Sequence, residues 1–420
     1  MLDINFIRHN PEKVAEAAKN KRIEVDVDKI LTLDKLCREL NTKSDALRAK
    51  RNEFTKEIQA AAGGKKEELR LSVQEIKKEL TAIEDKMAEV KTELDGLLLT
   101  VPSVPDSDVP VGKTEDDNVE LRKVGILRKF DFKPKDHLEL CQDLDLLDTA
   151  GAVKVAGSRS YMLKNDGMLL QMAVTRYVVD FLVARGYMPV DASVLVRPSA
   201  MQGTGYFPIG KDQAYYIGED DLFLAGTSEV SLVGRYTDEI MPAAKLPVKM
   251  VGLSTCFRRE AGAAGRDTRG LYRVHQFQKV EQVIICKKDD ADVYFAELLK
   301  NAEDILTSLG LPYRVALACT GEIGLGQTKK CEVETWMPSR EGYCETHSCS
   351  KLGDFQARRL NIRYKDEGGV CFAHTLNNTA IASPRILIPI LETYQNKDGS
   401  VSIPDVLVPY MGKKTIKAKG

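Results

Sequence analysis

The sequence lacks any uninterrupted apolar run of the length that a membrane-crossing helix needs, about 20 residues. Its first residues, MLDINFIRHNPEKV, place charges where a signal peptide needs an apolar core, and acids where a mitochondrial transit peptide avoids them. These absences predict a protein with no membrane partner and a cytoplasmic location. Hydrophobic residues still make up 43% of the 420 residues, which is enough for a large folded core.

Paired cysteines, clustered histidines and a strong net charge are also absent. The nine cysteines are odd in number and form no CxxC pair, and the five histidines show no metal-ligand spacing. We therefore expect free thiols in a reducing compartment, and neither a disulfide framework nor a zinc site. Because the formal net charge is only −1, any contact with RNA must come from local basic patches. The chain also has no Walker loop of the form GxxxxGK[ST].

The clearest periodic pattern lies near the N-terminus. Apolar residues recur every seven residues in a first series, and in alternating steps of four and three in a second series: Leu33, Leu40, Leu47, Phe54; then Leu69, Val73, Ile76, Leu80, Ile83, Met87, Val90, Leu94, Leu97. Such steps are typical of a coiled-coil seam. Because Gly63 and Gly64 separate the two series, we predict an antiparallel helical hairpin, an arm roughly 45 Å long at about 1.5 Å per residue.

Basic residues concentrate in the first helix and the tip of this arm. Between Lys43 and Arg70, eight basic residues face five acids, whereas the helix beyond Arg70 is net acidic. This distribution is compatible with an RNA-binding arm. The alternative is a dimerisation coil or a spacer, because charge on a coiled coil is more often a solvated face.

A proline-rich segment follows the arm and predicts the domain boundary. Thr100 to Asn118 reads TVPSVPDSDVPVGKTEDDN, a composition typical of an extended linker. We therefore divide the chain into an N-terminal helical domain (1–99), a linker (100–118) and a second domain (119–420).

The stretch from Val251 to Cys286 predicts two antiparallel strands joined by a small-residue, basic loop. Side chains alternate on a strand, so Arg273, His275, Phe277, Lys279 and Glu281 would share one face. Phe277 could stack a flat ring, and Glu281, roughly 13 Å away at about 3.3 Å per residue, could accept hydrogen bonds from a small polar group. Arg258 could offer a fork of donors to a phosphate between them. The alternative is a solvated sheet face with one stray aromatic residue.

The segment FRREAGAAGRDTRGLYRVHQFQKVE resembles motif 2 of the class II aminoacyl-tRNA synthetases, in the form found in the seryl-tRNA synthetases. Other stretches resemble this family in the expected order along the chain. The arm and linker come first, and motif 1 follows at Gly186–Val190 and Val194–Val196, although Ala192 and Ser193 stand where prolines are usual. The TxE loop is Thr227-Ser228-Glu229, and motif 3 runs from Thr375 to Arg385, with Asn378 and Ala380 in place of glycines.

The resemblance implies an α+β fold, in which an antiparallel coiled-coil hairpin precedes a mixed, mainly antiparallel sheet flanked by helices. It also implies activation of L-serine by ATP with Mg²⁺ and transfer of the seryl group to a tRNA(Ser) with a long variable arm, and to selenocysteine tRNA. A homodimer is expected from motif 1. In motif 3, Pro384 after Ser383 predicts the start of a helix.

Residue roles are carried over by position. The catalytic residues would be Arg258, Glu345 and Arg385, and Glu345 with Ser348 would hold the metal. Serine would be bound by Thr227, Glu229, Arg258, Glu281, Asn377 and Thr379. ATP would be bound by Arg258, Glu260, Phe277, Glu345, Ser348 and Arg385. The tRNA would be bound by Lys43, Arg48, Lys50, Arg51, Arg266 and Arg269. His347 is interpreted as a structural residue and not as a catalytic base.

Two alternatives remain open from the sequence. One is a related enzyme that loads an amino acid onto a carrier protein, and the intact arm argues against it. The other is a non-catalytic coiled-coil interaction protein that keeps a synthetase-like domain. The charged residues Arg258, Glu281, Glu345 and Arg385 argue against that reading, because loss of function should remove such residues first.

Overall fold

The computed structural model describes residues 1–262 and 270–418. These fall into two compact units, residues 1–102 and 103–420. Within the described ranges, no helix is both long enough and apolar enough to cross a membrane. All nine cysteines are free thiols, as the sequence predicts.

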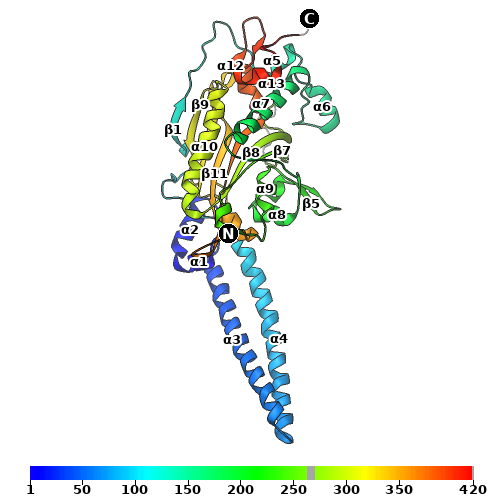
Figure 1. Cartoon of the computed structure of the whole chain (residues 1–420), viewed down its shortest axis with the longest axis vertical. Coiled ribbons are helices and arrows are strands. Elements are labelled where there is room, and N and C mark those ends of the chain that lie inside the picture. The colour runs from blue at the N-terminus through cyan, green and yellow to red at the C-terminus, as the bar shows by residue number, and fades with distance from the viewer. Residues whose placement is uncertain (263–269, 419–420) are drawn as a thin grey trace. The chain divides into compact units, whose positions relative to one another are not determined.

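The smaller unit is the predicted helical hairpin preceded by two short helices (Figure 1). Its helices are α1 (Ile4–His9), α2 (Pro11–Asn20), α3 (Val27–Ala60) and α4 (Gly64–Leu98). The side chain of Asp26 caps α3 by accepting a hydrogen bond from the backbone N–H of Lys29 at 2.9 Å. Side chains from all four helices form one apolar cluster at the base of the hairpin: Ile7, Val14, Val27, Ile30, Leu94, Leu98 and Val101.

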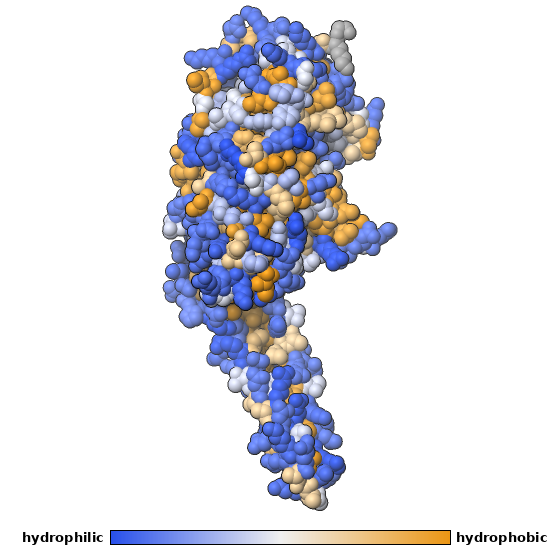
Figure 2. Space-filling view, in the orientation of Figure 1, coloured by the Kyte–Doolittle hydropathy of each residue, from blue (hydrophilic) through white to orange (hydrophobic). Residues whose placement is uncertain are grey.

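The seam along the hairpin follows the predicted heptads. Ile76, Leu80 and Val90 of α4 are at most 6% exposed. On the face drawn in Figure 2, most of the surface of the two helices is hydrophilic. The hairpin is therefore an amphipathic pair whose apolar stripes pack against each other.

Residues 103–118 differ from the extended linker expected for 100–118. Backbone hydrogen bonds tie Ser103 to Leu325 and Asp106 to Thr328, each at 2.9 Å. Val109 is buried with Ala318 and Ile323. Proline and aspartate composition suggested a free linker, but this segment has partners for its backbone groups and so belongs to the larger unit.

The larger unit is built on an eight-stranded sheet with the order β1-β9-β10-β11-β14-β8-β7-β2. All neighbours are antiparallel except β2 and β7, so the mixed, mainly antiparallel sheet is confirmed. The strands are β1 (Val119–Val124), β2 (Met188–Asp191), β7 (Val248–Phe257), β8 (Gln276–Cys286), β9 (Tyr313–Leu317), β10 (Lys329–Met337), β11 (Gly342–Gly353) and β14 (His374–Ser383).

The two faces of this sheet are covered differently. On one face, α7 (Asn165–Val183) and α10 (Ala291–Ser308) pack over the main apolar core, and Figure 1 shows α10 lying along the strands. On the other face, α9 (Glu229–Gly234) and α11 (Phe355–Leu360) cover one end, where Met250, Val283 and Ile285 form a second apolar cluster. The rest of that face stays open to a polar pocket.

Smaller elements complete the unit. Its other helices are α5 (His137–Asp143), α6 (Thr149–Ala156), α8 (Pro198–Gly203), α12 (Leu387–Tyr394) and α13 (Val408–Met411). Its other strands are β3 (Leu195–Val196), β4 (Tyr215–Ile217), β5 (Leu222–Leu224), β6 (Ile240–Pro242), β12 (Arg363–Asp366), β13 (Gly369–Phe372), β15 (Val401–Ser402) and β16 (Thr415–Ile416). The prediction that a helix begins at Pro384 is wrong, because α12 begins at Leu387. A turn precedes the helix: the backbone N–H groups of Ile386 and Leu387 donate hydrogen bonds to the carbonyls of Ala382 and Pro384.

Candidate active site

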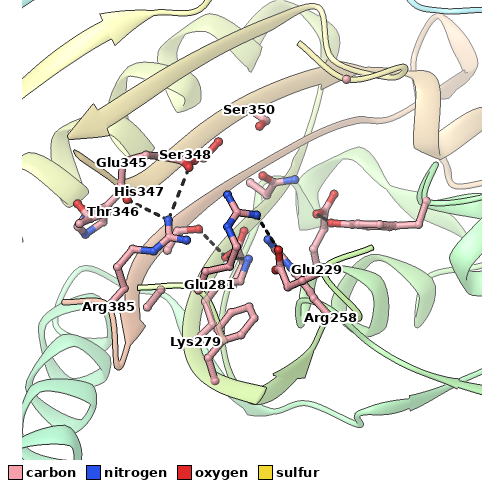
Figure 3. Close-up of a pocket in the computed structure, with 18 of the residues that line it drawn as sticks. Glu229, Arg258, Lys279, Glu281, Glu345, Thr346, His347, Ser348, Ser350 and Arg385 are labelled. Carbon is pink, nitrogen blue, oxygen red and sulfur yellow. Dashed lines mark hydrogen bonds and ion pairs between the residues drawn. The ribbon is translucent and has the colours of Figure 1, made fainter. Parts of the chain in front are cut away.

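A cavity of about 400 Å³ opens on the polar part of the sheet face. Its walls come from β8, β11 and β14, from the end of β7, and from loops near α8 and α12. Ten of the residues expected to bind serine, ATP or metal line it: Glu229, Arg258, Glu260, Phe277, Glu281, Glu345, Ser348, Asn377, Thr379 and Arg385. Figure 3 labels six of them around the cavity: Glu229, Arg258, Glu281, Glu345, Ser348 and Arg385.

Alternation along β8 explains one wall of the cavity. Phe277, Lys279 and Glu281 point to the cavity, and the same face continues into the apolar cluster with Val283 and Ile285. The observed strand is shorter than the sequence predicts. It begins at Gln276, so Arg273 and His275 lie before it.

Glu281 is almost completely buried, at 2% exposure, and has two polar neighbours. Its Oε2 lies 2.7 Å from Lys279 Nζ and accepts a hydrogen bond from Thr379 Oγ1 at 3.3 Å. Thr379 stands directly opposite Glu281 in the β14–β8 pairing. A buried carboxylate needs such partners, and this one is fixed from two strands.

A bulge in β11 brings Glu345 and Ser348 to the same face. Their three-residue spacing would put them on opposite faces of a regular strand. In the structure Ser348 pairs with Glu332 and Glu345 pairs with Glu334, so one extra residue, Thr346, lies between them. Both side chains therefore face the cavity.

His347 links this bulge to a second one in β14. The ring Nε2 lies 3.0 Å from the carbonyl oxygen of Ala380, the extra residue of the second bulge, and Nδ1 lies 2.8 Å from Thr346 Oγ1. Burial lowers the pKa of His347 to about 4. A buried, neutral ring with both nitrogens engaged suits a structural role.

Arg385 is held rigidly beside Glu345. Its Nε donates to the Tyr272 carbonyl at 3.0 Å, and its Nη1 donates to the Glu345 carbonyl at 2.9 Å. The guanidinium also lies 4.3 Å from the centre of the Tyr272 ring and 3.6 Å from Glu345 Oε2. Burial raises the pKa of Tyr272 to about 12, so its ring is neutral. Arg385 keeps further N–H donors that can serve an anion.

Arg258 is held more loosely at the end of β7. Its Nη2 donates one long hydrogen bond, 3.3 Å, to the Gly226 carbonyl, and its guanidinium lies 5.2 Å from the centre of the Phe277 ring. Glu260, also in the cavity wall, forms an ion pair with Arg273 at 2.6 Å. Arg258 thus presents most of its fork to the cavity between Phe277 and Glu281.

Glu229 and Thr227 occupy different positions relative to the cavity. Glu229 lines it, whereas Thr227 is fully buried and its Oγ1 accepts a hydrogen bond from the Glu229 backbone N–H at 3.3 Å. Burial, followed by the nearby negative charge of Glu281, raises the pKa of Glu229. Such a carboxylate is a ready partner for a ligand cation.

Two of the six residues expected to bind tRNA lie outside the residues that the structure describes. Arg266 and Arg269 fall among residues 263–269, which the structure does not describe. Lys43, Lys50 and Arg51 lie on α3, and Lys43 and Lys50 are exposed. Arg48 donates to Glu84 of α4 at 2.8 Å, so it joins the two helices of the hairpin.

Sequence reasoning missed several residues of the site. Lys279 was visible in the β8 alternation but received no role. Tyr272 lies within the motif 2 segment but also received no role. Tyr206 and Gln356 come from separate segments, and no local pattern joins them to the site. Among the described residues, no cluster of three or more His, Cys, Asp or Glu side chains is arranged to hold a metal ion by itself.

Comparisons with known proteins cover both units. The model of the seryl-tRNA synthetase N-terminal domain matches residues 1–105, and that of the class II tRNA synthetase core domain (G, H, P, S and T) matches residues 216–394. A serine–tRNA ligase from Deinococcus radiodurans is 45% identical over 99% of both chains.

Solved structures agree with these matches. The seryl-tRNA synthetase of Pyrococcus horikoshii complexed with ATP superposes with a TM-score of 0.94, at 37% identity over 100% of both chains. The cytoplasmic serine–tRNA ligase of Naegleria fowleri in complex with AMP gives 0.90 at 32% identity, covering 100% of this chain and 99% of that one.

Proposed function

Because this chain belongs to the seryl-tRNA synthetases, class II enzymes that join serine to tRNA with ATP, we propose that its central cavity activates L-serine and charges tRNA(Ser). The observation that carries the proposal is that two buried carboxylates, Glu229 and Glu281, line the same cavity as the Arg258 guanidinium. This set offers a cation site, a hydroxyl acceptor and an anion site within one cavity.

Serine would occupy the inner end of the cavity. Glu229 would bind the ammonium group, with Thr227 fixing the local backbone. Glu281 would accept a hydrogen bond from the substrate hydroxyl, with Thr379 and Asn377 beside it. Arg258 would hold the substrate carboxylate next to the α-phosphate of ATP.

ATP would occupy the outer part of the cavity. Phe277 would stack the adenine, with Glu260 at the rim, and Arg385 would hold the γ-phosphate. Glu345 and Ser348 supply hard oxygen ligands on one face, which suits Mg²⁺ bound mainly through ATP phosphates. Bound Mg²⁺ would neutralise phosphate charge.

The chemistry needs no protein nucleophile. A serine carboxylate oxygen attacks the α-phosphorus, the bond to the β-phosphate oxygen breaks, and pyrophosphate leaves with the electron pair. The terminal ribose hydroxyl of tRNA then attacks the acyl carbonyl, loses its proton, and AMP leaves. The chain contributes positioning, and Arg258 stabilises the charge that builds on the α-phosphate.

The arm would hold the tRNA outside the cavity. Lys43, Lys50 and Arg51 on α3 would contact the long variable arm of tRNA(Ser), and the same contacts would admit selenocysteine tRNA. Arg266 and Arg269 are proposed to contact the acceptor end. The free thiols fit a reducing, cytoplasmic location for this reaction.

A homodimer is proposed from the exposed edge of the sheet. Met188 on β2, Leu195 on β3 and Leu253 on β7 are 41%, 46% and 36% exposed. Leu253 pairs with Asp191 of β2, so Met188 and Leu253 lie on neighbouring strands of the main sheet. Exposed apolar residues that lie near each other are typical of an interface.

The test uses Glu281, because the substrate is too small for shape alone to select it. One methylene changes binding by only about 1–3 kcal/mol, whereas an analogue without the hydroxyl leaves a buried acceptor unpaired. In serine-dependent pyrophosphate exchange, Glu281→Ala should raise the KM for serine at least about tenfold and narrow the preference for serine over alanine. Unchanged exchange with serine and unchanged rejection of alanine would contradict the assignment.

A further inference from the structure

A buried hydrogen-bond network supports Glu229 from behind. Its Oε1 accepts from Gln356 Nε2 at 2.7 Å, and its Oε2 accepts from Tyr206 Oη at 3.0 Å. Gln356 lies on α11 and is fully buried, whereas Tyr206 follows α8 and lines the cavity. Two elements far apart in the sequence thus supply one donor to each carboxylate oxygen.

The orientation of the Gln356 amide is fixed by its other neighbours. Its Nε2 also lies 3.0 Å from the Thr204 carbonyl, which can only accept hydrogen bonds. Its Oε1 accepts from Thr375 Oγ1 at 2.7 Å. The amide N–H₂ must therefore face Glu229, and the reverse orientation would set oxygen against oxygen.

The charged groups around Glu229 act on its ionisation in opposite directions. Glu281 on β8 disfavours its ionisation, as does burial, whereas Lys279 on β8 favours it. Arg258 at the end of β7 lies near the same Tyr206 hydroxyl. With burial and a second carboxylate acting against its charge, Glu229 depends on donors that stabilise the ionised form. Both Gln356 and Tyr206 lower the pKa of Glu229, which burial otherwise raises.

We propose that Gln356, together with Tyr206, is a positioning residue that keeps Glu229 ionised and aimed at the substrate ammonium group, and so sets the lower pH limit for serine use. This inference rests on the proposed role of Glu229. Gln356 does not line the cavity itself and acts through the carboxylate. When Glu229 takes up a proton it loses the charge that attracts the ammonium group, so the KM for serine rises as the pH falls.

The test compares two equally buried glutamines in the full-length protein. Gln356→Met keeps the side-chain length but removes the donor. Gln282→Met is the matched control, because Gln282 is also 0% exposed but bonds to Asn301 on the opposite face of β8. Serine-dependent pyrophosphate exchange is measured across the pH range, with kcat/KM for serine and KM for ATP determined separately.

Loss of one donor to a buried carboxylate should move the acid limb of kcat/KM for serine upward by about one pH unit. KM for ATP should stay unchanged, and Gln282→Met should leave the acid limb in place. Tyr206→Phe removes the second donor and should shift the limb in the same direction, which keeps the proposal testable if Gln356→Met folds poorly. An acid limb that does not move in either variant overturns the proposal.

Glu229→Gln separates this inference from the role on which it rests. If Glu229→Gln leaves KM for serine unchanged, the amino-group assignment itself is wrong. If Glu229→Gln raises KM for serine but neither donor variant shifts the acid limb, only the role of Gln356 and Tyr206 is wrong.

Discussion

Arg258 and Arg385 carry the same charge into the cavity, but the fold holds them differently. Two backbone carbonyls and the Tyr272 ring fix Arg385, whereas Arg258 makes one hydrogen bond of 3.3 Å. A loosely held guanidinium is free to align both arms of its fork with a ligand. Arg258 therefore suits a group whose charge changes during the reaction, and Arg385 suits one that must stay in place.

Arg258→Lys tests whether the fork matters beyond its charge. Lysine keeps the positive charge but loses the planar, bidentate geometry. We expect serine-dependent pyrophosphate exchange to fall at least about 10²-fold, as for loss of one preorganised donor. Arg259→Lys is the control, because Arg259 is exposed and does not line the cavity. Equal rates for the two variants would show that Arg258 has no special part in the reaction.

For individual residues, local sequence patterns predicted only part of the site. Alternation on β8 placed Phe277 and Glu281 on one face, since a strand has a fixed period. Gln356 and Tyr206 could not be predicted, because they reach Glu229 through tertiary packing of α11 and α8. No spacing in the sequence records that contact.

Side-chain periodicity predicted the two long helices better than it predicted the faces of the strands. The heptads predicted α3 and α4 because the two seams bury each other and need no further partner. The period of two failed on β11, where the extra residue Thr346 moves Ser348 to the face of Glu345. Such a bulge depends on the pairing with β10 and on contacts of His347 with β14, which a single strand does not encode.

A prediction for the arm follows from its seam. Leu80 on α4 is 4% exposed, and Leu71 on the same helix is 56% exposed. Leu80→Ala should destabilise the hairpin by about 2–5 kcal/mol, whereas Leu71→Ala should change stability by less than about 0.5 kcal/mol. Thermal unfolding followed by circular dichroism measures the difference.

The same pair of variants tests what the arm does. If the arm holds the tRNA, Leu80→Ala should reduce tRNA charging while serine-dependent pyrophosphate exchange in the larger unit stays near the parent level. Leu71→Ala should keep both activities. Full charging by a variant with a demonstrably melted arm would contradict an RNA-binding role.

In the molecule as a whole, the cavity and the residues assigned to tRNA binding on α3 lie in different compact units. All residues of the cavity lie within residues 103–420, and the basic residues assigned to tRNA on α3 lie within residues 1–102. Residues 103–118 belong to the larger unit because their backbone groups bond to it. The sequence predicted the two units but not this boundary, since composition does not show which partner a segment finds.

Within the described residues, the eight-stranded sheet of the larger unit ends in two edge strands, β1 and β2, and the β2 end carries the last prediction. The apolar patch consists of three exposed side chains: Met188 on β2, Leu253 on the neighbouring strand β7, and Leu195 on β3 of a separate small sheet. In a symmetric dimer the same patch would meet its copy, so one added charge would appear twice in the interface and repel. Leu253→Asp should therefore convert a dimer into a monomer.

Light scattering after size-exclusion chromatography measures the change, from about twice 46.7 kDa to 46.7 kDa. Val155→Asp is the matched control, because Val155 lies on α6, outside the patch, and is 76% exposed. It should keep the parent mass. Leu195→Asp provides a second probe of the patch if Leu253→Asp unfolds, since Leu195 is more exposed and its loss leaves a smaller gap. A dimer that survives in both patch variants, with native circular dichroism, would place the interface elsewhere on the molecule.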